Sequence, residues 1–231
     1  MTTAERLSRT AASTAVEALG WRYLVGTLAA AVPVTSLAEA VRLGAAVTAA
    51  AGPVADDHLR LDLRPSRVDL SVQTRALGGV TQADVELVRA VTAALAELGA
   101  APAPPTRAQF DRPVQLLELA VDALDIPAVR PFWKAVLALA DDPADPGPAG
   151  GLVDPAGQLP TVWFQQMDAP RPQRNRIHLD VTVSHDEGAD RVRAALDAGG
   201  RLVSDSAARA FWVLADVEGN EVCVCTWQDR D

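Results

Sequence analysis

The most regular alternation in the chain is the run NRIHLDVTV at residues 175–183. Four aliphatic side chains, from Ile177 to Val183, occupy every second position, and polar side chains stand between them. A period of two over this length predicts a β-strand with one face in a core. The other face carries His178 and Asp180 side by side. We expect that face to line a polar pocket.

Composition excludes two classes of partner. The chain has 231 residues, enough for one large domain or for two of about 100 to 120 residues. Its net charge is −9, and it contains one lysine, Lys134, and no basic run. Phosphate contacts need clustered Lys and Arg, so we expect no nucleic-acid partner. No apolar run approaches the roughly 18 residues of a membrane span, so we expect no membrane partner.

The N-terminus and the cysteines indicate the compartment. Residues 1–10 include charged side chains and lack the apolar region of a secretory signal. Cys223 and Cys225 stand two apart on a predicted strand, where disulfide geometry is hard to reach. Free thiols are typical of a reducing compartment, so we expect a cytoplasmic protein.

The first half of the chain alternates helical and extended patterns. Ser36 and Glu39 have the spacing of a capping box, and Thr81 with Asp84 in the first turn begins an amphipathic helix. Residues 64–66 join two alternating runs as a hairpin. The expected elements are a helix at 3–19, strands at 21–24 and 27–32, a helix at 36–51, strands at 58–63 and 67–74, and a helix at 81–98.

A Pro- and Ala-rich segment at 100–112 has the composition of a linker, so we expect domains at 1–99 and 113–231. In the second domain the order strand, helix, strands occurs twice, which predicts a structural repeat. The expected elements are a strand at 114–121, a helix at 127–140, a long loop at 141–160, strands at 161–167 and 176–183, a helix at 187–198, and strands at 201–203, 210–214 and 221–226.

The motif GGVTQAD at 78–84 and the triplet LGW at 19–21 carry a resemblance along nearly the whole first half. This half resembles the pterin-4a-carbinolamine dehydratases. The resemblance implies an α+β fold, with a four-stranded antiparallel sheet and helices on one face. It also implies a unit that often mediates oligomerisation, so we expect a homo-oligomer.

In that family a His-His-Pro and a Thr-His-Asp supply imidazoles as acid and base. Here the corresponding triplets are Asp57-His58-Leu59 and Thr74-Arg75-Ala76. The resemblance leaves His58 and Asp57 as candidate catalytic groups, with Arg75 as a ligand contact. A guanidinium does not exchange protons near neutral pH, so Arg75 cannot replace a histidine. We expect a degenerate pocket, with retained dehydration of a pterin carbinolamine as the alternative.

Three motifs carry a second resemblance: VWFQ at 162–165, NRIHLD at 175–180 and DVEGN at 216–220. On these residues the second half resembles the compact glyoxalase-like members of the vicinal oxygen chelate superfamily. The resemblance implies two βαβββ units, which form an open cup with its site on the concave face.

The family's metal-ligand positions hold Glu118, Gln165, His178 and Cys223 in this chain. This set does not match the usual Ni, Zn or Fe sites, although a mixed zinc site is chemically possible. We therefore expect no metal and no other cofactor, with these four residues as the ligands if a divalent metal is present. Glu118 and His178 are the expected acid–base pair.

The remaining candidates would contact a ligand. Trp163 and Trp212 are expected in the core by default, or as apolar walls of the cup. Asp180 and Cys223 complete the expected ligand contacts. The function that follows is a metal-independent small-molecule enzyme acting in the cup. A non-catalytic small-molecule binding protein is the alternative.

Overall fold

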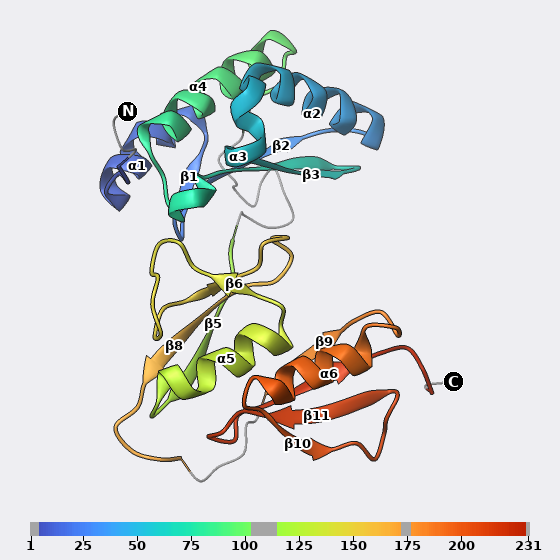
Figure 1. Cartoon of the computed structure of the whole chain (residues 1–231). Coiled ribbons are helices and arrows are strands. Elements are labelled where there is room, and N and C mark those ends of the chain that lie inside the picture. The colour runs from blue at the N-terminus through green and yellow to red at the C-terminus, as the bar shows by residue number, and fades with distance from the viewer. Residues whose placement is uncertain (1–4, 103–114, 172–176, 230–231) are drawn as a thin grey trace. The chain divides into compact units, whose positions relative to one another are not determined.

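The computed structural model describes residues 5–102, 115–171 and 177–229. The chain divides into two compact units, residues 1–116 and 117–231, which are considered separately (Figure 1). Most of the expected linker at 100–112 lies outside the described residues. Both units combine helices with antiparallel or mixed sheets, so the expected α+β class is confirmed.

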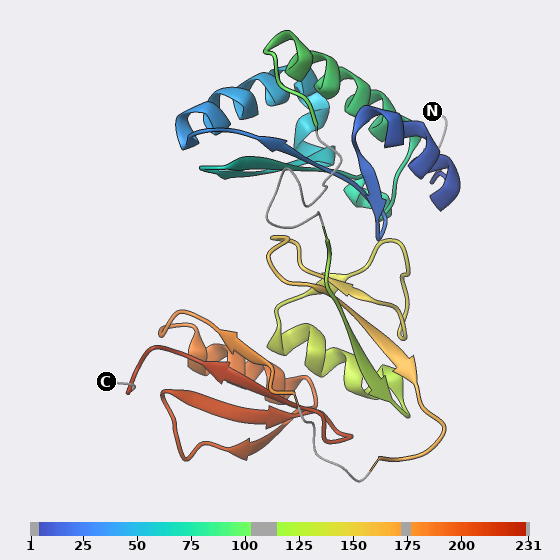
Figure 2. The same ribbon diagram turned by 180° about the vertical axis from the view of Figure 1, so that it is seen from behind.

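The first unit contains a four-stranded antiparallel sheet in the order β1-β2-β4-β3. Helices α2 and α4 lie side by side on one face of this sheet, and α1 packs beside α4 (Figure 2). The core between the layers contains Trp21, Leu28, Leu43, Leu70 and Leu95, each at most 1% exposed. The elements are α1 (Arg9–Val16), β1 (Arg22–Leu24), β2 (Thr27–Pro33), α2 (Leu37–Ala51), α3 (Ala55–His58), β3 (Leu59–Arg64), β4 (Arg67–Val72) and α4 (Gln82–Glu97).

Helix caps explain where α2 and α4 begin. The Ser36 hydroxyl accepts from the Glu39 amide at 3.2 Å, as expected for an N-cap. The Glu39 carboxylate, however, accepts from the amide of Thr35 at 2.7 Å rather than closing a box on Ser36. At α4 the box is complete, because the side chains of Thr81 and Asp84 each accept from the other's backbone amide.

Two sequence-based boundaries in this unit are wrong. The first helix is capped by Ser8 and begins at Arg9, because the Ser8 hydroxyl accepts from the Ala11 amide; residues 3 and 4 of the helix expected at 3–19 lie outside the described residues. His58 ends the short helix α3 instead of beginning a strand. The imidazole therefore projects from a helix end at the edge of the sheet.

The expectation about apolar runs also needs correction. The segment Leu37–His58 is long and apolar enough, by length and composition alone, to cross a membrane. Within it α2 ends at Ala51, and a 3₁₀ turn at Gly52–Val54 separates it from α3. Leu43 and Val47 pack in the core. Helix α2 therefore serves as a core helix of the first unit.

The second unit contains two βαβββ repeats with identical strand order. The sheets run β5-β8-β7-β6 and β9-β12-β11-β10, and in each the first and fourth strands pair in parallel. This confirms the expected paired βαβββ architecture. The elements are β5 (Glu118–Ala123), α5 (Ile126–Val136), β6 (Ala140–Asp141), β7 (Leu152–Val153), β8 (Thr161–Gln166), β9 (Asp180–Thr182), α6 (Gly188–Asp197), β10 (Arg201–Ser204), β11 (Phe211–Ala215) and β12 (Glu221–Cys225).

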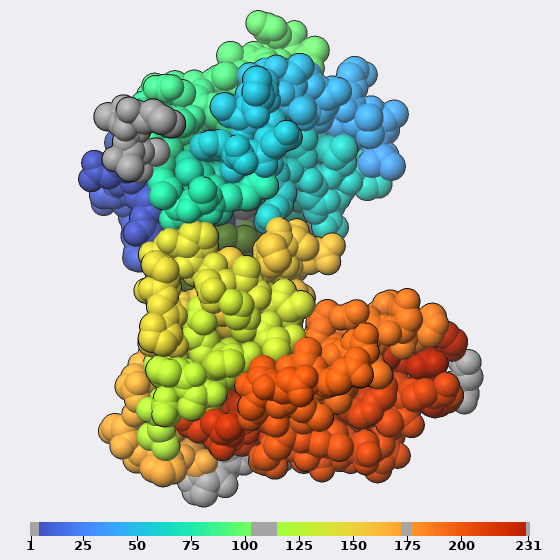
Figure 3. Space-filling view, in the orientation of Figure 1, coloured from blue at the N-terminus to red at the C-terminus, as the bar shows by residue number. Residues whose placement is uncertain are grey.

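Polar contacts fasten the two repeats to each other. Helices α5 and α6 are in contact (Figure 3), and their residues share one hydrophobic core. The Trp133 indole donates to the buried Asp216 carboxylate at 3.0 Å. Glu218 accepts from the amides of Leu124 and Asp125 at 2.7–3.0 Å, at the start of α5. The DVEGN motif thus joins the repeats.

Three strand boundaries in this unit differ from expectation. Residues 114 and 176, where two of the strands are expected to begin, lie outside the described residues. The described part of the first expected strand is extended from Glu118. The described part of the second forms a strand only at β9, because β12 pairs with it only from Cys223 to Cys225. Ile177 precedes β9 and is 74% exposed, so it does not join a core. The expected loop at 141–160 contains the short strand β7 and follows β6.

Candidate functional site

In the first unit His58 is held by a buried carboxylate. Its Nδ1 lies 2.7 Å from Oδ1 of Asp84, and the imidazole side chain is 16% exposed whereas Asp84 is 0% exposed. The two residues are 26 positions apart, on α3 and in the first turn of α4. A carboxylate only accepts hydrogen bonds, so Nδ1 is the donor in this contact, and a neutral His58 ring has its lone pair on Nε2.

The second oxygen of Asp84 explains why a charge is tolerated there. Oδ2 accepts from the amide and hydroxyl of Thr74 at 3.1 and 2.7 Å. It also accepts from the amide and hydroxyl of Thr81 at 2.7 and 3.1 Å. Thr74 reaches this position because it bridges to Gly79 as the chain turns into α4. These four donors replace the hydrogen bonds to water that the Asp84 side chain loses on burial.

The other two candidates of this unit lie around His58 without bonding to it. Arg75 begins a 3₁₀ turn after β4, and its Nη2 donates to the carbonyl of Leu59 at 2.8 Å. Asp57 is exposed on α3. Among the described residues no ion pair joins Asp57 to His58 or to Arg75. The carboxylate that contacts His58 is therefore that of Asp84 and not that of Asp57.

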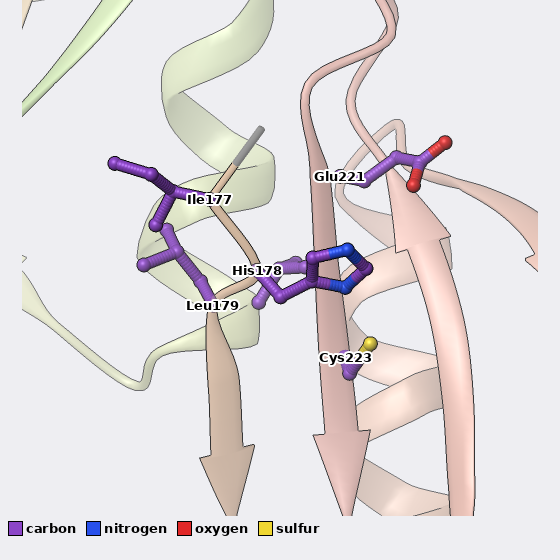
Figure 4. Close-up of a pocket in the computed structure, with 6 residues that line it drawn as sticks. Ile177, His178, Leu179, Glu221 and Cys223 are labelled. Atoms are coloured by element: carbon purple, nitrogen blue, oxygen red, sulfur yellow. The ribbon is translucent and has the colours of Figure 1, made fainter. Parts of the chain in front are cut away.

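In the second unit a small open pocket surrounds His178. Its lining comes entirely from the second repeat, and the enclosed space is about 10 Å³. The His178 ring lies between the carboxylate of Glu221 and the thiol of Cys223, beside β12 (Figure 4). A space of this size holds about one water molecule. A larger ligand would therefore lie mostly outside the pocket, on its open side.

Cys223 has a protonated thiol at neutral pH. Burial, followed by the hydrogen bond and the charge of the neighbouring Asp180 carboxylate, raises the pKa of the Cys223 thiol to about 11. Asp180 stands opposite Cys223 in the parallel pairing of β9 with β12. The thiolate is the nucleophilic form of cysteine, so a nucleophilic role does not suit this side chain near pH 7.

The candidates of the first repeat lie apart from this pocket. Glu118, Trp163 and Gln165 occupy exposed positions on the sheet face opposite the buried Val162 and Phe164. The structure shows no hydrogen bond or ion pair between Glu118 and His178, both of which are described. An acid–base role for these two side chains stays a prediction.

Two further expectations concern Trp212 and the metal. Trp212 stands opposite the buried Val224 and packs near Gly188 of α6, so it joins the core rather than the pocket face. Within residues 5–102, 115–171 and 177–229, no three His, Cys, Asp or Glu side chains are grouped as metal ligands. Of the four expected ligands, only His178 and Cys223 line one pocket.

Sequence reasoning missed two residues. Asp84 was assigned only to the helix start, and Glu221 only to a strand. The spacing of three residues between Thr81 and Asp84 predicts a helix cap. The contact of Asp84 with His58, 26 residues earlier, leaves no local pattern in the sequence. The available signal for Glu221 was its alternation with Cys223, which places both side chains on one face of β12.

Comparisons with known proteins divide the chain in the same way. Residues 5–94 match the family model of pterin 4 alpha carbinolamine dehydratase, and residues 118–225 match that of a glyoxalase-like domain. No curated protein matches the chain.

Among solved structures, a transcriptional coactivator/pterin dehydratase from Brucella melitensis is 24% identical, with a TM-score of 0.35. The match covers 39% of this chain and 98% of that one. A glyoxalase/bleomycin resistance protein/dioxygenase family enzyme from Burkholderia phytofirmans is 19% identical, with a TM-score of 0.40, covering 49% and 98%. Fosfomycin resistance protein FosX from Mesorhizobium loti is 9% identical, with a TM-score of 0.38, covering 48% and 90%. On the two family models, the chain joins a pterin-4a-carbinolamine dehydratase-like domain to a glyoxalase-like domain of the vicinal oxygen chelate superfamily.

Proposed function

We propose that the first unit removes water from a pterin carbinolamine, with His58 as its single acid–base catalyst. The observation that carries this proposal is the 2.7 Å contact between His58 and the fully buried Asp84. A carboxylate behind a histidine fixes both the orientation of the ring and the nitrogen that carries the proton. This arrangement supplies what a lone histidine beside the exposed Asp57 lacks.

One imidazole is sufficient for the proton balance. Loss of water from a carbinolamine removes a hydroxyl group from carbon and a proton from the adjacent nitrogen. Nε2 of His58 accepts the proton from nitrogen, and the imidazolium then donates it to the departing hydroxyl. The carbon–nitrogen double bond forms, water leaves, and His58 returns to its neutral form. Asp84 stabilises the imidazolium during the step.

The test uses the same substitution in both units. Rates of dehydration of a synthetic 4a-carbinolamine are compared for the wild type, His58→Gln and His178→Gln. The proposal predicts that the wild type and His178→Gln accelerate the reaction equally, and that His58→Gln does not. A loss in His178→Gln with none in His58→Gln would move the chemistry to the second unit.

A second proposed function is small-molecule binding by the glyoxalase-like unit. The pocket formed by Leu179, Glu221 and Cys223 around His178 supports it. Because the Cys223 thiol is protonated and Glu118 lies elsewhere, we propose a binding role rather than catalysis. A thermal-shift screen of small aromatic acids and amines tests this role. A compound that stabilises the wild type is expected to fail with Glu221→Gln or His178→Ala.

We further propose that the protein is a homo-oligomer that associates through α2. Leu37 and Val41 lie one turn apart on this helix and are 51% and 54% exposed. Large apolar side chains on one exposed stripe favour contact with a second apolar surface.

We also propose the cytoplasm as the compartment. Cys223 and Cys225 are buried and are not joined by a disulfide, as expected in a reducing environment.

A further inference from the structure

Arg75 is fixed beside the proposed catalyst. Its Nη2 donates to the carbonyl of Leu59 at 2.8 Å, and Leu59 directly follows His58. The residue is otherwise exposed, at the start of the 3₁₀ turn Arg75–Leu77. A guanidinium carries five N–H donors, so one bond to the backbone leaves the others available to a ligand.

The charge of Arg75 is not neutralised by a neighbouring carboxylate in the part of the chain that the structure describes. Asp84, the buried carboxylate of the site, is fully occupied by His58 and by two threonines. Asp57 is close in sequence to His58, but it forms no ion pair with Arg75 among the described residues. The site therefore combines one proton-transferring imidazole with one fixed and unpaired cation.

Because the Arg75 guanidinium does not exchange protons near neutral pH, its role in the site would be to bind an anionic group of the substrate. The planar guanidinium matches the two oxygens of a carboxylate or phosphate group, and such paired contacts fix orientation as well as affinity. The anchor on Leu59 reduces the side-chain freedom that would be lost on binding, which favours recognition over a merely solvated surface arginine.

We propose that Arg75 selects pterin substrates that carry an anionic substituent, a carboxylate or a phosphate, and binds that group while the carbinolamine carbon faces His58. The proposal rests on the proposed dehydration by the first unit and adds the substrate class. Arg75 is a specificity residue in this account, because it touches the substituent and not the reacting atoms.

The test measures equilibrium binding of three fluorescent probes: pterin-6-carboxylate, neopterin monophosphate and uncharged neopterin. A charge-assisted contact is expected to favour at least one anionic probe by about 10- to 100-fold over neopterin. Arg75→Gln is expected to abolish that preference, and Arg75→Lys to retain part of it. Arg89→Gln, an equal loss of charge at an exposed position of α4, is expected to leave it unchanged.

The outcomes separate the two anions and the two proposals. Preference for one anionic probe alone identifies the substituent. If neither anionic probe binds more tightly than neopterin, selection by Arg75 is overturned. Failure of all three probes to bind overturns it as well. A preference that survives in Arg75→Gln also overturns it, as does an equal loss in Arg89→Gln. Each of these results leaves the rate difference between the wild type and His58→Gln untouched.

Discussion

Asp84→Asn removes the charge behind His58 with little change in shape. Four donors point at Oδ2 of Asp84, so the introduced amide is expected to place its oxygen there. Its NH₂ group then faces Nδ1 of His58, where the carboxylate oxygen was at 2.7 Å. Nδ1 must accept that hydrogen bond, so the proton moves to Nε2. The lone pair required of the catalyst is lost from the substrate side.

The expected magnitude follows from the role of the group. Acid–base catalysis by a positioned side chain contributes about 10²–10⁴-fold, or roughly 3 to 5 kcal/mol of transition-state stabilisation. The dehydration rate is expected to fall by that factor. Stability is expected to fall by only about 1–3 kcal/mol, because hydrogen bonds to a charged acceptor weaken while the cost of burying the charge disappears.

Two measurements check this prediction. The chain has three histidines, so the imidazole ¹⁵N signals can be assigned by single substitutions and used to read which nitrogen of His58 carries the proton. Thr81→Val is the matched control, since it removes one hydroxyl donor to Asp84 and leaves the contact with His58 in place. A wild type with the proton on Nε2 would refute the reasoning. So would Asp84→Asn with an unchanged rate.

Three further predictions concern other parts of the chain. Cys223, whose pKa is raised to about 11, is expected to react with iodoacetamide at pH 8 far more slowly than free cysteine does. In the unfolded protein it is expected to react as fast as free cysteine. Equal reaction rates of Cys223 in the folded and the unfolded protein would contradict this. Burial raises the pKa of Asp69 despite the 2.9 Å contact with Arg67, so the folded state binds a proton at Asp69 more readily than the unfolded state does. The contribution of this proton to the free energy of unfolding is present below pH 3.8 and is lost as pH rises through the folded pKa. Urea titrations should therefore show Asp69→Asn gaining stability relative to the wild type between pH 4 and pH 7, and a constant difference would refute it. Val41→Glu is expected to reduce the mass measured by light scattering to that of the monomer, whereas Val217→Glu, at a similarly exposed residue, is not; an unchanged mass in both would remove α2 as the interface.

The order of elements could be predicted because it depends on local patterns. Ser36 and Thr81 carry the N-cap chemistry that begins α2 and α4. The repeated strand-helix-strands order could be predicted for the same reason. Boundaries failed where tertiary contacts decide them. The alternation around Ile177 predicts a face but not a partner, and β12 extends alongside only three residues of β9.

The site could be predicted only in part. His58 and His178 stood out as imidazoles at positions defined by the two resemblances. The partner of His58 could not be predicted, because Asp84 reaches it through the turn that brings Thr74 to Gly79. The resemblance places Glu118 and His178 at ligand positions of the family, but it does not fix the distance between the two side chains in this chain.

The most direct test of the central claim is the rate constant for dehydration of a pterin 4a-carbinolamine by His58→Gln relative to the wild type. The account predicts a clear acceleration by the wild type, and a fall of about 10²–10⁴-fold in the variant while its fold is retained. Equal rates for the two proteins, or a wild type that does not exceed the uncatalysed reaction, would contradict it.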